Sequence, residues 1–275
     1  MRMIANNFSN NGLIRLKNNE WIEKQRISGK VAAKTLCILK QLVENRTNKS
    51  LIELDKIAYE HIKDNKCEPT FLGYKGFPNT CCISVNQQLV HGIASNTPLQ
   101  EGDMISFDLG AEIDGVIADT ALTCIYGEPK SEKQVKLIQA TEEALSKGIT
   151  AIQVGKQLGV IGNAIHKCAK GYGFGLIENY GGHGIDTDDN GKGIPHAFPF
   201  VANKALPNEG IRMQAGMCLA IEPMLTIGST KTRVDLDGWT VWCDAEYSSH
   251  AEMTVFIHED RVEIMTDRSE LIYEQ

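Results

Sequence analysis

The sequence predicts an α+β fold in which two pairs of α-helices flank one antiparallel β-sheet with pseudo-twofold symmetry. Three observations carry this prediction. The order helix, helix, strands occurs twice along the 275 residues. A strong β-hairpin signal lies at residues 105–120. The helical segments of both halves have one apolar side, which needs a sheet or another helix to cover it.

The first half begins with two helices. From 19 to about 44, apolar residues recur largely at steps of three and four, as from Leu36 to Leu39 and Val43. After a polar break at 47–50, a second helical pattern starts at Leu51. A strand is predicted at 82–86 and an apolar segment at 89–93, and these lead into the hairpin.

Asp108 and Asp119 lie on the two strands of this hairpin, 11 positions apart, on either side of Asp114-Gly115. A four-residue loop at 112–115 would place them directly opposite one another, and a two-residue Asp114-Gly115 loop would make them diagonal neighbours on the same face. A three-residue loop with a bulge would separate them. Two carboxylates on a half-buried face need a cation between them, or one must be protonated. The alternative is an Asp that faces water at a strand end.

The second half repeats the order at an offset of roughly 107. Helices are predicted at 133–152 and from about 158, followed by a glycine-rich stretch at 171–184. Strands are predicted near 217–222, 238–244 and 251–257. We therefore expect a short disordered or extended lead-in at 1–13 and a single domain at 14–275, built from halves at about 14–127 and 128–270.

Composition and charge exclude several classes of protein. The net charge of −7 and the isoelectric point near 5.6 provide no electrostatic footprint for nucleic acid or an anionic membrane. No apolar run approaches the roughly 18 residues of a membrane span, and the N-terminus lacks the apolar segment of a signal peptide. The eight cysteines show no CxxC spacing and are predicted to be reduced thiols. We expect a cytoplasmic protein.

Acidic residues and a histidine recur in strand-like surroundings late in the chain. Glu222 and Glu252 each stand in an apolar run, and His183 stands among glycines that allow close backbone approach. Either glutamate alone would be typical of a strand end that faces water. Together with the two hairpin aspartates they form an oxygen-rich ligand set without thiolate, which favours Mn²⁺, Fe²⁺ or Co²⁺ over a structural zinc. Four carboxylates are enough to neutralise two divalent ions.

At these residues the chain resembles the type I methionine aminopeptidases, which have the pita-bread (creatinase/aminopeptidase) fold. The resemblance covers roughly residues 14 to 270. It is carried by Gly73–Pro78, Cys82–Asn86, His91–Ile93, Asp108, Asp119, Gly182–Ile185, Ile221–Pro223, Asp237–Thr240, Glu252 and Thr254, in that order.

The resemblance implies two divalent ions, which are cobalt, manganese or iron. Asp119 and Glu252 would bridge them, Asp108 would complete one, and His183 with Glu222 would complete the other. It also implies metal-dependent removal of the N-terminal methionine of new proteins, with a preference for a small second residue. Glu222 would shuttle the proton during hydrolysis.

Other positions match the family's substrate contacts. His196 resembles the histidine that stabilises the tetrahedral intermediate. His91 resembles the one that contacts the nitrogen of the scissile bond or the adjacent peptide; on its own, His91 would be interpreted as a loop histidine. The resemblance implies a methionine pocket lined by Tyr74, Phe77, Cys82 and Trp239. Phe71 stands where many relatives have a smaller residue, which predicts a narrower pocket or a partly covered entrance.

Two departures from the family pattern lie near His196. It follows His183 by 13 positions, about six more than is usual, so residues 186–193 are predicted to bulge outward as a surface loop. Pro195 replaces an aromatic or apolar residue. We expect Ile194–His196 to return to the site, and we expect His250 and His258 to be solvated strand residues.

The resemblance implies the N-terminal peptides of new proteins as partners, with the ribosome as a second candidate, and no nucleic acid or membrane. We expect a monomer. Two other functions stay open. A proline-directed peptidase of the same fold would carry a large extra N-terminal domain and further histidines that this chain lacks. A non-catalytic binding protein would have lost metal ligands, whereas all five are present here.

Overall fold

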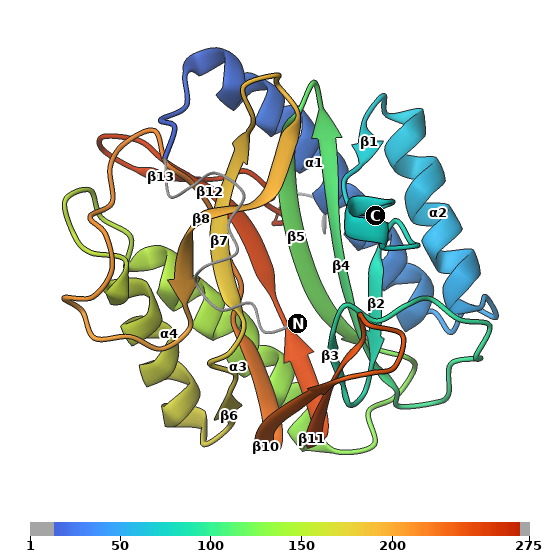
Figure 1. Ribbon diagram of the computed structural model, residues 1–275. Helices are drawn as coiled ribbons and strands as arrows, with labels where there is room; N and C mark the ends of the chain where they lie inside the picture. Colours follow the sequence, from blue (N-terminus) through green and yellow to red (C-terminus); the bar gives the residue numbers. More distant parts are fainter. Residues whose placement is uncertain (1–13, 270–275) are drawn as a thin grey trace.

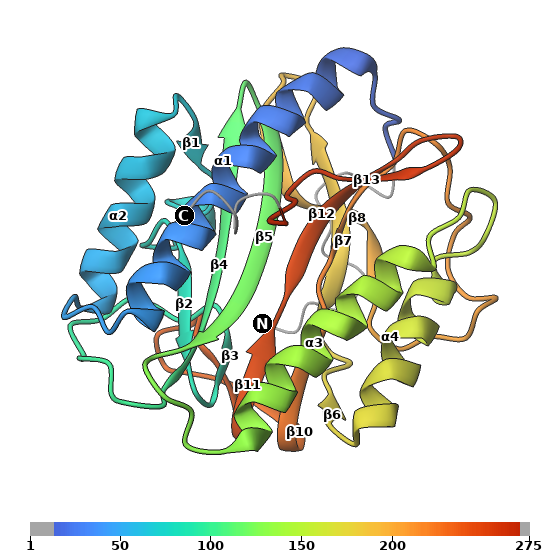
Figure 2. The same ribbon diagram turned by 180° about the vertical axis from the view of Figure 1, so that it is seen from behind.

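The computed structural model describes residues 14–269, so the predicted lead-in at 1–13 lies outside the described residues. Four helices cover one face of a curved antiparallel sheet, and Figure 2 shows them as two pairs that lie across its strands. They are α1 (Asn19–Glu44), α2 (Leu51–Asp64), α3 (Glu132–Thr150) and α4 (Gly159–Tyr172), with a short 3-10 turn η1 at Tyr74–Gly76. The predicted α+β fold is confirmed.

The strands form two sheets. The larger runs in the order β1-β4-β5-β12-β9-β7-β8, with β13 beside β12 and β2 beside β4; the smaller runs β3-β11-β10-β6. The larger sheet contains β1 (Glu68–Pro69), β2 (Cys82–Val85), β4 (Met104–Ile113), β5 (Val116–Ile125), β7 (Gly181–Thr187), β8 (Gly193–Ala202), β9 (Cys218–Ile221), β12 (Glu252–Ile257) and β13 (Val262–Ile264). The smaller contains β3 (Gln88–Val90), β6 (Gly175–Leu176), β10 (Met224–Val234) and β11 (Val241–His250).

Each helix pair buries its apolar side in a core of its own. Leu36, Leu39 and Val43 of α1 share one cluster with residues of α2 and β4, and Leu137 and Leu145 of α3 share another with residues of α4 and β9. The pairing of β5 with β12 joins the strands of the first part of the chain to those of the second. The division into halves near residue 127 stays a prediction.

The β4–β5 hairpin has the two-residue loop. Asp114 and Gly115 connect the strands with φ angles of 49° and 78°, the conformation that a tight hairpin turn of this type needs. Asp108 pairs with Ala121, and Gly110 pairs with Asp119. The two aspartates are therefore diagonal neighbours on one face, as one of the predicted alternatives requires.

The prediction that residues 186–193 bulge outward as a surface loop was wrong. Asp186 continues β7, β8 starts at Gly193, and only the residues between Thr187 and Gly193 form the tip of a long hairpin. Asp186 is 2% exposed and forms ion pairs with Lys17 and with Arg15, the latter at 3.4 Å. A buried carboxylate needs such partners, so the inserted residues fasten the chain segment that precedes α1.

Two crossings between the sheets frame the site. The chain leaves the larger sheet after β9 through Glu222 and Pro223 and enters the smaller one at β10. It returns from β11 to β12 at Ala251, whose N–H donates to the Pro223 carbonyl at 3.3 Å. Residues at both crossings thus lie side by side.

Two further observations concern the described residues as a whole. None of the helices within 14–269 is long and apolar enough to cross a bilayer. All eight cysteines are free, and six of them are buried.

The close approach of α1 to residue 265 yields a test of the packing. A Cβ added at Gly29 would lie 2.0 Å from the carbonyl oxygen of Met265. We therefore expect Gly29→Ala to lower the free energy of unfolding by about 1–3 kcal/mol, as overpacking does. Gly171 lies in the last turn of α4, and among the described residues a Cβ added there would meet no heavy atom within 4 Å beyond its chain neighbours and its own helix backbone. It is therefore the matched control. Gly171→Ala should raise the free energy by up to about 1 kcal/mol through helix propensity. Urea unfolding of both variants measures the difference, and equal effects would contradict this account.

Candidate metal centre

Five side chains from distant parts of the sequence meet where the two sheets join. Asp108 and Asp119 come from β4 and β5, His183 from β7, Glu222 from the crossing after β9, and Glu252 from the first position of β12. The sheet register explains the meeting, because Glu252 pairs with Ala121 and His183 pairs with Ala220. All five are at most 9% exposed.

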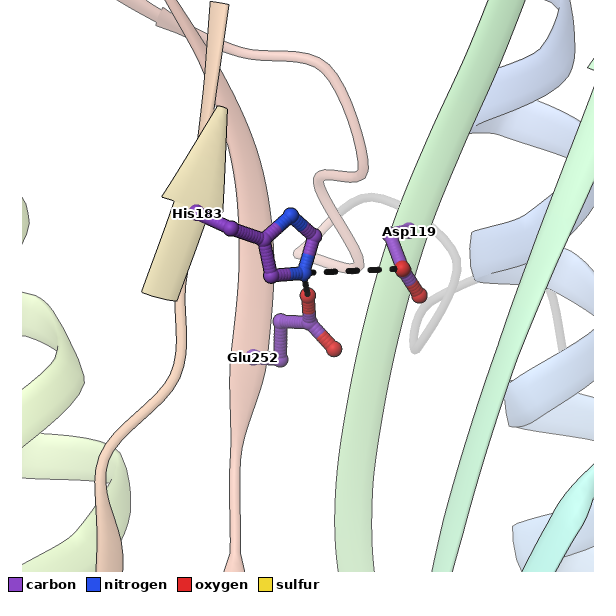
Figure 3. A group of neighbouring side chains, drawn as sticks. All are labelled: Asp119, His183 and Glu252. Carbon is purple, nitrogen blue, oxygen red and sulfur yellow. Dashed lines mark ion pairs between the residues drawn. The ribbon is translucent and has the colours of Figure 1, made fainter. Parts of the chain in front are cut away.

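The imidazole of His183 lies at the centre of this group. Its Nε2 atom is 3.6 Å from Glu222 Oε1 and 4.0 Å from both Asp119 Oδ2 and Glu252 Oε1. Figure 3 shows His183, Asp119 and Glu252 converging from three strands. One ligand atom from each lies within 4.8 Å of the others, which is close enough for all three to bind a common ion.

Burial and mutual repulsion dominate the electrostatics of the carboxyl groups. Burial raises the pKa of Asp119 to about 7. Burial, and after it the charge of Asp119, raises the pKa of both Asp108 and Glu252 well above its usual range. Burial followed by the charges of Asp108 and Asp119 does the same for Glu222. In the absence of a cation the four carboxylates repel one another, and this repulsion favours their protonated forms.

The donor set fits divalent cations. Asp108 Oδ1, Asp119 Oδ1 and Glu252 Oε1 are buried and have no hydrogen-bond partner. The Nδ1 atom of His183 lies 3.1 Å from the Gly184 carbonyl oxygen. That contact assigns the proton to Nδ1 and leaves Nε2 with a free lone pair toward the carboxylates. Because buried charges in proteins are paired or bind metals, these atoms are candidate ligands.

Hydrogen bonds between β5 and β12 hold two of the ligands. The hydroxyl of Thr254 accepts from the Asp119 N–H at 2.8 Å and donates to the Asp119 carbonyl at 2.7 Å. The Thr120 hydroxyl donates to the Glu252 carbonyl at 2.9 Å, and Arg268 donates to the Thr120 hydroxyl at 2.8 Å. These bonds fix the spacing of Asp119 and Glu252 through their backbones.

A cavity of about 360 Å³ opens directly beside the cluster. Cys82 pairs with Asp108 across β2 and β4, so the wall of the cavity continues into the acidic group. The structure brings together every residue predicted to contact substrate. These lining residues are Phe71, Tyr74, Phe77, Cys82, His91, His196 and Trp239.

The aromatic part of the wall is fixed by its own contacts. The rings of Phe77 and Trp239 meet edge to face with centroids 5.2 Å apart. Phe71, Phe77 and Cys82 form one buried apolar cluster that Trp239 covers. A preformed apolar surface of this kind suits an aliphatic or thioether side chain.

Both predicted histidines reach the site. The ring of His196 lies 4.6 Å from that of His183 and 5.5 Å from that of Tyr74, so the longer hairpin does not displace it. The ring of His91 stands edge to face with those of Trp239 and Tyr180. Burial lowers the pKa of His91 to about 4 and that of His196 well below its usual range, so both rings are neutral at pH 7.

Sequence reasoning missed several lining residues, Tyr180 among them, and misplaced one neighbour. Tyr180, directly before the glycines at 181–182, lines the cavity. His250 was predicted to be a solvated strand residue, but it is 1% exposed, and its Nε2 atom lies 3.3 Å from Glu222 Oε2. The prediction overlooked that His250 lies two positions before the candidate ligand Glu252. Strand alternation puts two such residues on the same face, which is the signal that was available.

Comparison with known proteins agrees with this geometry. Residues 23–259 match metallopeptidase family M24. A methionine aminopeptidase from Mycoplasma capricolum is 40% identical over 255 residues, which cover 92% of this chain and 98% of the relative. The crystal structure of methionine aminopeptidase from Thermotoga maritima superposes with a TM-score of 0.86 at 34% identity, over 93% of this chain and 100% of that one.

A more distant structure shares the fold alone. A prolidase from Pyrococcus furiosus has a TM-score of 0.71 at 21% identity, and the match covers 92% of this chain but 65% of the prolidase. The pita-bread architecture is therefore common to peptidases of different substrate preference, and the fold does not by itself select among them.

The raised pKa of Asp119 predicts how the metal-free protein responds to pH. A carboxyl whose pKa is about 7 when folded and about 4 when unfolded holds its proton more tightly in the folded state. Its contribution to stability is complete at low pH and is lost as the pH rises from about 4 through 7. In the presence of a chelator, wild type should therefore lose stability relative to Asp119→Asn across this range. Urea unfolding at each pH measures the difference, and a difference independent of pH would contradict the assignment.

Proposed function

The chain belongs to metallopeptidase family M24, and on that premise we propose that its cavity binds two divalent cations and the N-terminal residue of a peptide. Its activity is that of a methionine aminopeptidase, the metal-dependent hydrolysis of the bond that follows an N-terminal methionine. The observation that carries this function is the direct contact of an apolar cavity with four buried carboxylates and an imidazole.

The proposed ligands are the five residues of the cluster. Asp119 and Glu252 would bridge the two ions, Asp108 would complete one, and His183 with Glu222 would complete the other. The unpartnered buried oxygens of Asp108, Asp119 and Glu252 support their role as ligands. Cobalt, manganese and iron are the proposed ions, because carboxylates with one imidazole suit all three. When bound, the ions supply Lewis acidity that lowers the pKa of a water and polarises the scissile carbonyl.

Glu222 is the proposed proton shuttle. It lines the cavity between the two sheets, and burial and the neighbouring carboxylates Asp108 and Asp119 raise its pKa well above its usual range, which favours proton uptake. It would accept a proton from the attacking water and deliver it to the leaving amine.

The two neutral histidines have separate proposed roles. His196 would donate a hydrogen bond to the oxyanion of the tetrahedral intermediate, because its ring adjoins the ring of the candidate ligand His183. His91 would contact the nitrogen of the scissile bond from its place between Tyr180 and Trp239. A neutral imidazole serves either purpose as a donor.

The proposed substrate is the N-terminus of a new protein with a small second residue, which would lie in the crowded part of the site beside the ligands. We propose residues 14–275 as one catalytic domain that acts as a monomer in the cytoplasm. The ribosome, where new N-termini emerge, is the second proposed partner.

A peptide assay tests the activity. With Mn²⁺, Fe²⁺ or Co²⁺ added, the protein should release methionine from Met-Ala-Ser and leave an Xaa-Pro peptide intact. Asp119→Asn, which removes a charged bridging ligand, should lower kcat/KM by at least about 100-fold. Cleavage of only the Xaa-Pro peptide, or no cleavage with any of the ions, would contradict the assignment.

The predicted narrowing of the pocket by Phe71 gives a second prediction. Because Phe71 fills part of the apolar wall, Phe71→Ala should weaken the binding of methionine and let a larger N-terminal residue such as phenylalanine enter. We expect kcat/KM for Met-Ala-Ser to fall by roughly tenfold, in keeping with about 1–3 kcal/mol for lost apolar contacts. The ratio of kcat/KM for Phe-Ala-Ser to that for Met-Ala-Ser should rise. An unchanged ratio would show that Phe71 does not limit the pocket.

A further inference from the structure

His250 is a buried histidine that none of the roles above uses. Its side chain is 1% exposed, and its Nε2 atom makes no hydrogen bond within residues 14–269, although Glu222 Oε2 lies only 3.3 Å away. It does not line the cavity, so it has no direct access to a peptide there. A buried polar atom aimed at one carboxylate oxygen is a feature that calls for an explanation.

The backbone of His250 is fixed from the neighbouring strand. Its N–H donates to the Thr123 hydroxyl at 2.9 Å, and that hydroxyl lies 2.8 Å from the His250 carbonyl oxygen. Thr123 is in turn held by Ser106, whose hydroxyl lies 2.8 Å away. These bonds fix the backbone from which the ring projects, and the burial of the side chain leaves the ring little room to turn away from Glu222.

The two crossings between the sheets place the ring and the carboxylate together. Glu222 leaves the larger sheet at the same level at which β11 ends with His250, and Met224 pairs with His250 in the register of β10 and β11. The two oxygens of Glu222 then face two imidazoles. Oε1 lies 3.6 Å from His183 Nε2, and Oε2 lies 3.3 Å from His250 Nε2.

We propose that His250 is a positioning residue for Glu222, donating its Nε2 proton to Oε2 so that Oε1 points at the metal centre. A carboxylate oxygen accepts hydrogen bonds, so the ring nitrogen is the donor in this pair. A group that holds a metal-binding carboxylate in this way typically contributes a factor of about 10–100 in metal affinity or activity. The proposal rests on the proposed function of Glu222 as ligand and proton shuttle.

The test is a pair of variants with matched shape. His250→Gln keeps an N–H donor at about the reach of Nε2, and His250→Met has the same unbranched length without a donor. Mn²⁺ affinity is measured by calorimetric titration of the metal-free proteins, and kcat and KM are measured on Met-Ala-Ser. His250→Met should bind Mn²⁺ about 10–100-fold more weakly and lose kcat by a similar factor with little change in KM, and His250→Gln should restore most of both.

Ser249→Ala is the control for disturbance of β11. Ser249 is 1% exposed on the same strand with an unpartnered hydroxyl, and strand alternation turns it to the other face. This variant should match wild type in Mn²⁺ affinity, kcat and unfolding temperature.

The outcomes separate this inference from the proposed function. Equal losses in the Gln and Met variants would overturn the positioning role, since the N–H donor would then be irrelevant. Wild-type affinity and kcat in a folded His250→Met would also overturn it. A wild type that neither binds Mn²⁺ nor releases methionine would overturn the proposed function and this inference with it.

Discussion

The structure depends on holding four carboxylates together where they are almost fully buried. Each of them would be more stable apart from the others, and burial raises the pKa of every one. Backbone hydrogen bonds between the strands counter this repulsion, because they fix the spacing of the strands independently of the side chains. Thr254 and Arg268 reinforce the seam between β5 and β12 at the point where the charges are closest. The fold keeps the carboxylates close despite their repulsion, and a bound cation would offset that repulsion.

The same strands bring the cavity to the charged group. Cys82 is the register partner of Asp108, so an apolar wall and a carboxylate are neighbours on adjacent strands. On the other side, the change of sheet at Glu222 and again at Ala251 brings the rim of the cavity against the smaller sheet, which supplies Val241 and the loop bearing Trp239. A substrate side chain that fills the cavity would place its own carbonyl beside the ligands. Specificity and chemistry are therefore linked by sheet register, and no moving part is needed to join them.

Local patterns in the sequence predicted the parts of this arrangement that local patterns control. Periodicity predicted α1 through α4, and the period of two along a strand, with an Asp-Gly turn, placed Asp108 and Asp119 on one face. The glycines of β7 and the prolines of β8 hid these two strands, because both residue types are depleted in strands. The burial of Asp186 depends on Lys17, which lies 169 positions away, and no local pattern contains that pairing. His250 is a different case, because its spacing of two from Glu252 was a local signal that indicated a shared face.

The longer hairpin shows why the site tolerates a change in chain length close to its ligands. An antiparallel hairpin that gains residues at its turn grows at the far end, while the pairs near its base keep their partners. Here His183 pairs with Phe200, and the register shifts between His183 and Gly184 and again between Gly184 and Asp186. His196 consequently returns to within ring contact of His183. The distal end is stabilised separately by the ion pairs of Asp186 with Lys17 and Arg15. It also packs against the tip of the neighbouring hairpin, where a Cβ added at Gly115 would lie 1.8 Å from the carbonyl oxygen of Gly191. The glycine at 115 is required twice, for its positive φ and for this contact, and the two hairpins thereby support each other at the end remote from the metal centre.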